Sequence, residues 1–212
     1  MASDRKFWNK IARKYATSKI SDMASYEYTL ARTQSHLLQT DQVLELGCGT
    51  GSTALVLAPC VGAYLGTDLS DEMIAIAREK NAAEGIAHLR FDTFDLGAHQ
   101  MDQQFDAILA FNLLHLVPDL NAALRRIDHM LKPGGVFISK TICYSSDWRG
   151  IALRAIMAVV PILRAFGKAP YAKITTIPDL HSRIDALGYE VLEQGNHPAS
   201  PPRRYIVARK PV

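Results

Sequence analysis

The stretch Val43-Leu44-Glu45-Leu46-Gly47-Cys48-Gly49-Thr50-Gly51 decides the fold of this chain. It begins as a short apolar run typical of a buried strand, and glycines then follow at alternate positions. The residues from Ser52 to Ala58 have a helical pattern. Glycine is needed where the backbone takes a positive φ or where a ligand approaches the main chain closely. Because a glycine turn between a strand and a helix directs free N–H groups at a ligand, this stretch predicts a nucleotide-binding turn.

The spacing of these glycines argues against a dinucleotide. A G-x-G-x-x-G fingerprint places its third glycine at position 52, where this chain has Ser52. The carboxylate of Glu45 would oppose a pyrophosphate, whereas it suits a cation such as the amino group and the sulfonium of S-adenosylmethionine. A P-loop is excluded as well, because the sequence has no G-x-x-x-x-G-K followed by serine or threonine.

Strand-like and helix-like segments alternate after this turn, which predicts right-handed crossovers and a parallel sheet covered on both faces. Strands are expected at 63–67, 88–91, 105–111 and 136–141, and helices at 70–84 and 120–131. The end of the chain departs from this rhythm. A helix at 178–187 is followed by two strands, 189–193 and 204–208, with a proline-rich loop and no helix between them. These two strands should therefore pair as an antiparallel hairpin, which gives an α/β, doubly wound and mostly parallel sheet.

Composition indicates an ordinary globular protein of one domain, residues 1–212. The chain is 48% hydrophobic and 21% charged, and its net charge of +3 with a pI of about 8.7 does not indicate a nucleic-acid partner. Cys48, Cys60 and Cys143 are scattered and lack metal-site spacing, so they are interpreted as reduced thiols of a cytoplasmic protein. The first residues are charged and include no apolar signal-peptide core, so no secretory signal is expected.

The glycine stretch resembles motif I of the class I S-adenosylmethionine-dependent methyltransferase family. Further blocks within residues 40–142 are also similar to this family, namely Phe-Asp-Ala-Ile-Leu-Ala-Phe-Asn-Leu-Leu-His-Leu at 105–116 and Leu-Lys-Pro-Gly-Gly at 131–135. Residues 7–15, Phe-Trp-Asn-Lys-Ile-Ala-Arg-Lys-Tyr, look like the lead-in helix of the small-molecule enzymes. The resemblance implies a Rossmann-like sheet of seven strands that ends in an antiparallel hairpin. It also implies S-adenosylmethionine as cofactor and S-adenosylhomocysteine as product.

The predicted cofactor site collects residues at the carboxyl ends of the strands, where ligands bind to doubly wound sheets. Asp68 follows the second strand, where a carboxylate can accept both ribose hydroxyls. The resemblance implies an acid for the adenine amine after the third strand, where Asp92-Thr93-Phe94-Asp95 can be aligned either way; we adopt Asp92 and keep Asp95 as its rival. The predicted cofactor-binding residues are Glu45, Gly47, Cys48, Gly49, Gly51, Asp68, Leu69, Asp92, Thr93, Ala110, Phe111 and Asn112.

Two residues are candidates for a catalytic role. His115 lies in a loop past the fourth strand, and its ordinary pKa near 6.5 suits a general base, although a structural or capping histidine is the alternative. Tyr15 either closes over the cofactor or packs with Phe7 and Ile11 on one side of a helix. Since neither is decisive, a non-catalytic S-adenosylmethionine- or S-adenosylhomocysteine-binding module stays open. A protein or RNA methyltransferase is a weaker alternative.

The methyl acceptor is predicted from the apolar segment 151–166, which only Arg154 and Arg164 interrupt. We expect a helical insertion over 145–175 and an N-terminal helical cap over 1–38 to cover a small, apolar acceptor. In this interpretation 151–166 is a helix buried on several sides, and a helix packed on the sheet is the alternative. Residues 1–20 also form a basic amphipathic pattern, which is compatible with peripheral membrane contact. The sequence does not distinguish a monomer from a homodimer.

Methyl transfer by this protein is predicted to be independent of metals, because its histidines, cysteines and acids lack the spacing of a metal site. Activity measured with and without a chelator should therefore be the same. A loss of activity that added Mg²⁺ or Zn²⁺ restores would instead reveal ligands brought together from distant positions.

Overall fold

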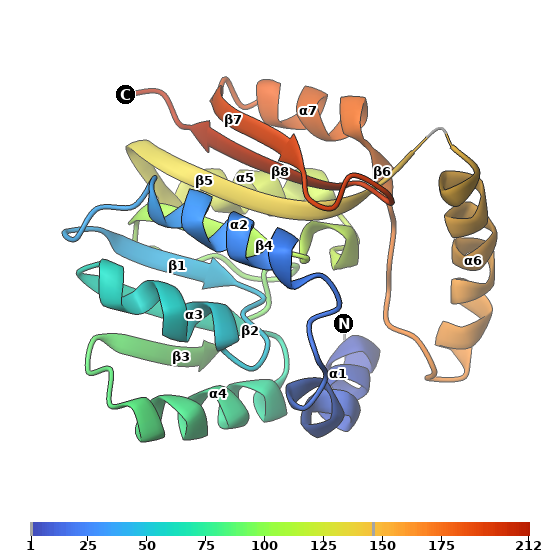
Figure 1. Cartoon of the computed structure of the whole chain (residues 1–212), viewed down its shortest axis with the longest axis horizontal. Coiled ribbons are helices and arrows are strands. Elements are labelled where there is room, and N and C mark those ends of the chain that lie inside the picture. Colours follow the sequence, from blue (N-terminus) through green and yellow to red (C-terminus); the bar gives the residue numbers. More distant parts are fainter. Residues whose placement is uncertain (1, 146) are drawn as a thin grey trace.

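A central sheet covered by helices on both faces forms the body of the protein (Figure 1). The computed structural model describes residues 2–145 and 147–212. The strands are β1 (Gln42–Leu46), β2 (Ala63–Asp68), β3 (Leu89–Thr93), β4 (Phe105–Phe111), β5 (Leu131–Tyr144), β6 (Thr175–Thr176), β7 (Glu190–Asn196) and β8 (Arg203–Arg209). The α-helices are α1 (Ala2–Ala16), α2 (Met23–Gln34), α3 (Ser52–Leu57), α4 (Asp71–Glu84), α5 (Leu120–Met130), α6 (Trp148–Ala165) and α7 (Ile177–Asp185). Short 3-10 turns occupy Ala58–Cys60 and Leu114–Leu116.

The main sheet has the strand order β3-β2-β1-β4-β5-β8-β7, and β6 pairs with the end of β5. Strands β1 to β5 pair in parallel, whereas β8 is antiparallel to both β5 and β7. The predicted mostly parallel sheet with a C-terminal antiparallel hairpin is therefore confirmed. The strand order reverses between β1 and β4, which places the switch point of the sheet directly above the glycine turn.

Strand β4 contributes to the hydrophobic core on both faces of the sheet, because its side chains on both faces are apolar. Ile108 and Ala110 belong to the cluster beneath α5 and α7, which also holds Leu124 and Ile184. Their neighbours along the strand, Ala107 and Leu109, belong to the cluster beneath α3 and α4. Successive side chains of a strand point to opposite faces, so a strand covered on both faces reads as one continuous apolar run.

The glycine turn has the backbone conformation that its sequence predicts. Gly47, Gly49 and Gly51 all have positive φ, at 70°, 55° and 76°. The turn is attached to β2, since the Cys48 N–H donates to the Thr67 carbonyl at 2.8 Å. A side chain at Gly51 would come within 2.7 Å of the Phe91 ring, so this glycine is required for packing as well as for conformation.

The prediction that residues 151–166 form a helix buried on several sides is wrong, because most of α6 is exposed. Ile151 is 64% exposed and Ile162 60% exposed. Figure 1 shows the helix standing beside the carboxyl ends of the strands, away from the body of the sheet. The physical reason is that other helices already cover both faces of the sheet. No helix of the described residues is long and apolar enough to cross a membrane.

Helix α1 has the position of a cover, one of the two interpretations that its amphipathic pattern allows. It packs against the start of α4, where Arg5 pairs with Asp71 at 3.2 Å and the Asn9 side chain accepts a hydrogen bond from Ser70 at 2.6 Å. Most basic residues of the helix are exposed, namely Lys6, Lys10, Arg13 and Lys14, whereas Trp8 is partly buried. Part of the apolar side of α1 is therefore covered within the domain.

The close approach of Gly66 in β2 to the Phe91 ring generates a stability prediction. A Cβ at Gly66 would lie 2.6 Å from two carbons of that ring, so Gly66→Ala should destabilise the fold by about 1–3 kcal/mol through overpacking. Phe91→Leu in the same chain should recover part of this loss, because the smaller side chain relieves the clash. Equilibrium urea unfolding of the two single variants and the double variant measures the coupling. Strictly additive effects would contradict the proposed clash.

Candidate functional site

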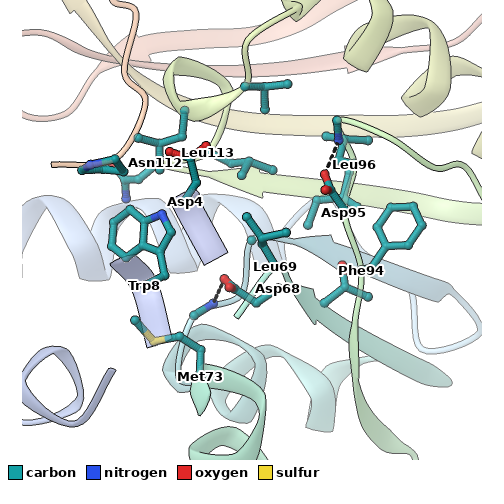
Figure 2. A pocket seen from close by; sticks show the side chains of 18 of the residues that line it. Asp4, Trp8, Asp68, Leu69, Met73, Phe94, Asp95, Leu96, Asn112 and Leu113 are labelled. Carbon is teal, nitrogen blue, oxygen red and sulfur yellow. Dashed lines mark hydrogen bonds between the residues drawn. The ribbon is translucent and has the colours of Figure 1, made fainter. Parts of the chain in front are cut away.

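A cleft opens at the carboxyl ends of β1, β2 and β4, as Figure 2 shows. Asp68 and Leu69 come from the end of β2, and Met73 from the first turn of α4. The α1 helix supplies Asp4 and Trp8 to the opposite wall. The loops after β3 and β4 and the segment 170–171 complete the lining. Helix α4 is held in place by Ser70, whose hydroxyl accepts the Met73 N–H at 3.1 Å as an N-cap.

Asp68 connects this cleft to the glycine turn. One carboxylate oxygen accepts the Gly49 N–H at 3.0 Å, and the other accepts the Ser70 N–H at 2.9 Å. Burial raises the pKa of Asp68, and these backbone hydrogen bonds oppose the rise. Each carboxylate oxygen has capacity for a second hydrogen bond. The group can therefore accept two hydroxyls from a ligand in the cleft.

Glu45 lies deeper, near the end of β1. Its residue is 2% exposed, and its carboxylate accepts the Tyr64 hydroxyl at 2.9 Å. Burial raises the pKa of Glu45 to about 7, with the Asp68 charge adding to the effect. Two acids beneath the glycine turn make this region favourable for a cationic group.

A second cavity lies across the glycine turn from the cleft. The two share Tyr15, Gly47, Gly49, Phe111 and Asn112. The second cavity is more polar, and Lys140 and Arg203 line one side of it.

Those two cations give the second cavity an electrostatic character opposite to that of the glycine turn. The Lys140 ammonium donates to the Thr29 hydroxyl at 2.7 Å and to the Ser25 carbonyl at 3.2 Å. Burial and the nearby Arg203 lower the pKa of Lys140 to about 8. The cavity can therefore hold a ligand that is cationic at one end and anionic at the other.

The two acids after β3 lie in different places relative to the cleft. The Asp92 side chain is 62% exposed and pairs with Arg78 at 2.8 Å, outside the cleft. Thr93 also lies outside and donates to Asp71. Asp95, the alternative in the sequence, lines the cleft. Strand β3 continues through Thr93, one residue past Asp92, so the chain turns toward the cleft later than the sequence pattern suggested.

The other predicted cofactor-binding residues divide into lining and supporting positions. Leu69 lines the cleft, and Glu45 and Cys48 line the second cavity. Gly51 and Ala110 line neither, because Gly51 packs against Phe91 and Ala110 lies in the core.

Asn112 differs in backbone conformation from the other non-glycine residues that line the two cavities. Its φ is positive, at 54°, and its N–H donates to the Lys140 carbonyl at 2.6 Å. A non-glycine residue in this conformation is typical of a site where the surrounding structure fixes the backbone.

The two candidate catalytic residues have different surroundings. His115 lines neither cavity, and its Nδ1 lies 3.3 Å from the Thr141 hydroxyl. Burial lowers the pKa of His115 to about 4, so the ring is neutral at pH 7. This arrangement corresponds to the structural histidine of the two interpretations. Tyr15 lines both cavities, beside Gly49 and edge-to-face with Trp8 at 6.4 Å between ring centroids.

Sequence reasoning missed part of this site. Trp8 lies within the helical block 7–15 and Lys140 within the expected strand 136–141, and neither pattern indicates a cavity. Arg203, Pro170 and Tyr171 carried no signal, because their positions depend on how distant segments meet in space. Asp4 is an example, since it accepts hydrogen bonds from both Arg164 and the Tyr171 N–H.

The central part of the chain is similar to known sequences. Residues 44–137 match the family described as methyltransferase domain. A ubiquinone biosynthesis O-methyltransferase of Nitrobacter winogradskyi is 32% identical over 164 residues, which cover 76% of this chain and 60% of that protein. The reducing polyketide synthase Preu2 of Preussia isomera is 35% identical over 116 residues, which cover 51% of this chain and 5% of the synthase. The chain thus spans less than two thirds of each of these curated relatives.

Solved structures show the same fold at low sequence identity. The complex of DhpI with S-adenosylhomocysteine has a TM-score of 0.75 at 21% identity, and the match covers 99% of this chain and 96% of that one. Magnesium protoporphyrin IX methyltransferase from Synechocystis, with bound S-adenosylhomocysteine, has a TM-score of 0.74 at 18% identity over 97% of both chains. These likenesses establish the Rossmann-like methyltransferase fold.

The buried Glu45 generates a prediction on pH and stability. Its pKa of about 7 in the folded protein lies above the ordinary value of 4.5, so protonation of Glu45 favours folding. This contribution to the free energy of unfolding is present at low pH and is lost as the pH rises from about 4.5 through 7. Glu45→Gln, which stays neutral, should therefore gain stability relative to the parent between pH 5 and pH 8, by up to roughly 2–3 kcal/mol. Urea unfolding across this range measures the gain. The exposed Glu79→Gln is the control and should show no such trend; equal behaviour of the two variants would contradict the assignment.

Proposed function

We propose that this chain is a class I S-adenosylmethionine-dependent methyltransferase that transfers the methyl group of S-adenosylmethionine to a small apolar acceptor. The observation that carries the proposal is the position of Asp68, whose carboxylate is fixed by the glycine turn and still faces the cleft. A ribose is the ligand that presents two adjacent hydroxyls to such a carboxylate.

In the proposed complex, the adenosine part of the cofactor occupies the cleft. Asp68 accepts the ribose hydroxyls, and Asp95 accepts the exocyclic amine of adenine. Leu69 lies beside Asp68, and Leu113 lines the same cleft near Asn112, so both provide apolar surface for the flat base. Asp95 replaces Asp92 in this role, because Asp92 lies outside the cleft.

The methionine part of the cofactor lies over Gly47 and Gly49, where the cleft meets the second cavity. The buried acids Glu45 and Asp68 favour its amino group and sulfonium. Lys140 and Arg203 face the second cavity and favour its carboxylate. Phe111 and Asn112 line the path between the two regions, and Tyr15 covers it from α1.

Transfer is a direct in-line displacement. A lone pair of the acceptor attacks the methyl carbon while the carbon–sulfur bond breaks, and the bonding electrons remain on sulfur to give neutral S-adenosylhomocysteine. The sulfonium already activates the methyl group, so the main contribution of the protein is to hold the reactants in line. His115 is not proposed as the base, because it lies outside both cavities. Tyr15 is proposed to position the sulfonium rather than to move a proton, since burial and the Asp68 charge raise the pKa of its phenol.

An apolar acceptor is supported by the apolar side chains that line the cleft. They include Trp8, Leu116, Val117 and Tyr171. We assign residues 1–38 to a cap over this site, with the 145–175 insertion reaching it through Pro170 and Tyr171. An apolar acceptor partitions into lipid, so peripheral membrane contact from the cytoplasmic side belongs to the same proposal.

Asp68→Ala is predicted to weaken the binding of S-adenosylhomocysteine by about 1.5–3 kcal/mol, the range for hydrogen bonds to a charged group. Asp92→Ala is the matched control and should bind with the affinity of the parent, because its side chain pairs with Arg78 outside the cleft. Isothermal titration calorimetry measures both affinities, and circular dichroism verifies the fold. Unchanged affinity in Asp68→Ala, or tight binding of NAD by the parent, would contradict the proposal.

A further inference from the structure

The outer side of α6 is an exposed apolar surface. Its members are Trp148, Ile151, Ile156, Val159, Ile162, Leu163 and Phe166, which we call the outer arc. Phe166, just past the end of the helix, is 75% exposed. Large aliphatic and aromatic side chains gathered on one helix are unusual at the surface of a soluble domain and indicate an interaction site.

The residues of the outer arc lie on one continuous side of α6. At 3.6 residues per turn, its members fall within a sector of about 140°. Leu153, Met157 and Val160 lie in the opposite sector and are partly buried. The helix therefore has two apolar sides, one turned to the domain and one turned to solvent, and only the second lacks cover.

The charges of α6 are all of one sign. From Trp148 to Lys168 the chain has Arg149, Arg154, Arg164 and Lys168 and no acidic residue. Arg164 is neutralised by Asp4 at 3.1 Å on the side of the domain. Arg154 stacks on the Tyr144 ring at 4.9 Å and forms no ion pair with an acid of residues 2–145 or 147–212. Apart from Asp147 at the N-cap of the helix, the surface around the outer arc is therefore basic.

We propose that the outer arc of α6 docks onto a bilayer that contains anionic lipid, with the helix lying in the plane of the interface. An apolar arc with basic flanks is the pattern of an interfacial helix, since apolar residues enter the acyl region while cations contact anionic headgroups. Trp148 stands at one end of the helix, where an amphipathic ring suits the headgroup level. A second copy of this chain fits less well, because the acids beside the arc already have partners in the same chain. Asp147 at the N-cap accepts hydrogen bonds from Ser145, Gly150 and Ser200, and Asp4 pairs with Arg164.

The docked helix would bring the cleft to the membrane surface. Asp4 accepts hydrogen bonds from Arg164 of α6 and from the N–H of Tyr171, and Asp4 and Tyr171 both line the cleft. Figure 2 shows Asp4 at the edge of the pocket beside Trp8 and Asn112. This part of the inference rests on the proposed function: an apolar acceptor dissolved in the bilayer would reach the cleft from the end of α6 without crossing water.

Sedimentation with lipid vesicles tests the docking surface directly. The full chain should bind vesicles of phosphatidylcholine and phosphatidylglycerol in equal parts, bind much less to phosphatidylcholine alone, and dissociate as salt is raised. Ile156→Ser combined with Ile162→Ser should lower the partition coefficient at least about tenfold, because two side chains lose their apolar contact with lipid. Leu38→Ser combined with Val56→Ser, two exposed apolar residues outside α6, is the matched control and should bind as the parent does.

The outcomes that overturn the inference are distinct. They are absence of vesicle binding, equal binding to neutral vesicles, or equal loss in the two double variants. A dimer in light scattering that the Ile156→Ser and Ile162→Ser changes dissociate, without vesicle binding, would assign the surface to a second copy. Calorimetry with S-adenosylhomocysteine on the same variants should give the parent affinity, so a failure of docking and a failure of the proposed function are separable.

Discussion

The hydrogen bonds of the Asp68 carboxylate are the constraint on which the rest of the site depends. One oxygen fixes the glycine turn after β1 through Gly49, and the other fixes the start of α4 through Ser70. Two crossovers of the sheet are thus aligned at a single acid, on the same edge where the strand order reverses. Because that acid is also the group offered to a ligand, the geometry of the cleft and the packing of the sheet cannot vary independently.

Electrostatic charge is separated across the site. Acids lie beneath the glycine turn and cations line the far side of the second cavity, so the site holds partly desolvated groups of both signs. A desolvated charge is stabilised by an opposite charge nearby, and a zwitterionic ligand would supply one for each sign. The cost of burying Glu45 and Lys140 in the folded protein is therefore connected to affinity for a ligand of this kind.

Features that depend on local pattern were predictable from the sequence. The apolar run of β4, the glycine turn and the capping residue Ser70 each follow from the residues themselves. Which of Asp92 and Asp95 lines the cleft was not predictable, because it depends on where β3 stops pairing with β2. The burial of α6 was mispredicted for a related reason. An apolar sequence indicates that a helix is stabilised by burial. Whether a face of the sheet remains free to bury that helix depends on the whole fold.

The insertion of β8 between β5 and β7 has a consequence for how the protein folds. Val136 pairs with Arg209, so this antiparallel pairing joins segments far apart in the chain, and contacts of such range form slowly. Before β8 arrives, β5 is an open edge with Phe137 and Ile138 beside unpaired peptide groups, which is a template for aggregation. Arg203 begins the same strand and lines the second cavity. A folding intermediate that contains only β1 to β5 would therefore expose the unpaired, aggregation-prone edge of β5 and would have an incomplete binding site.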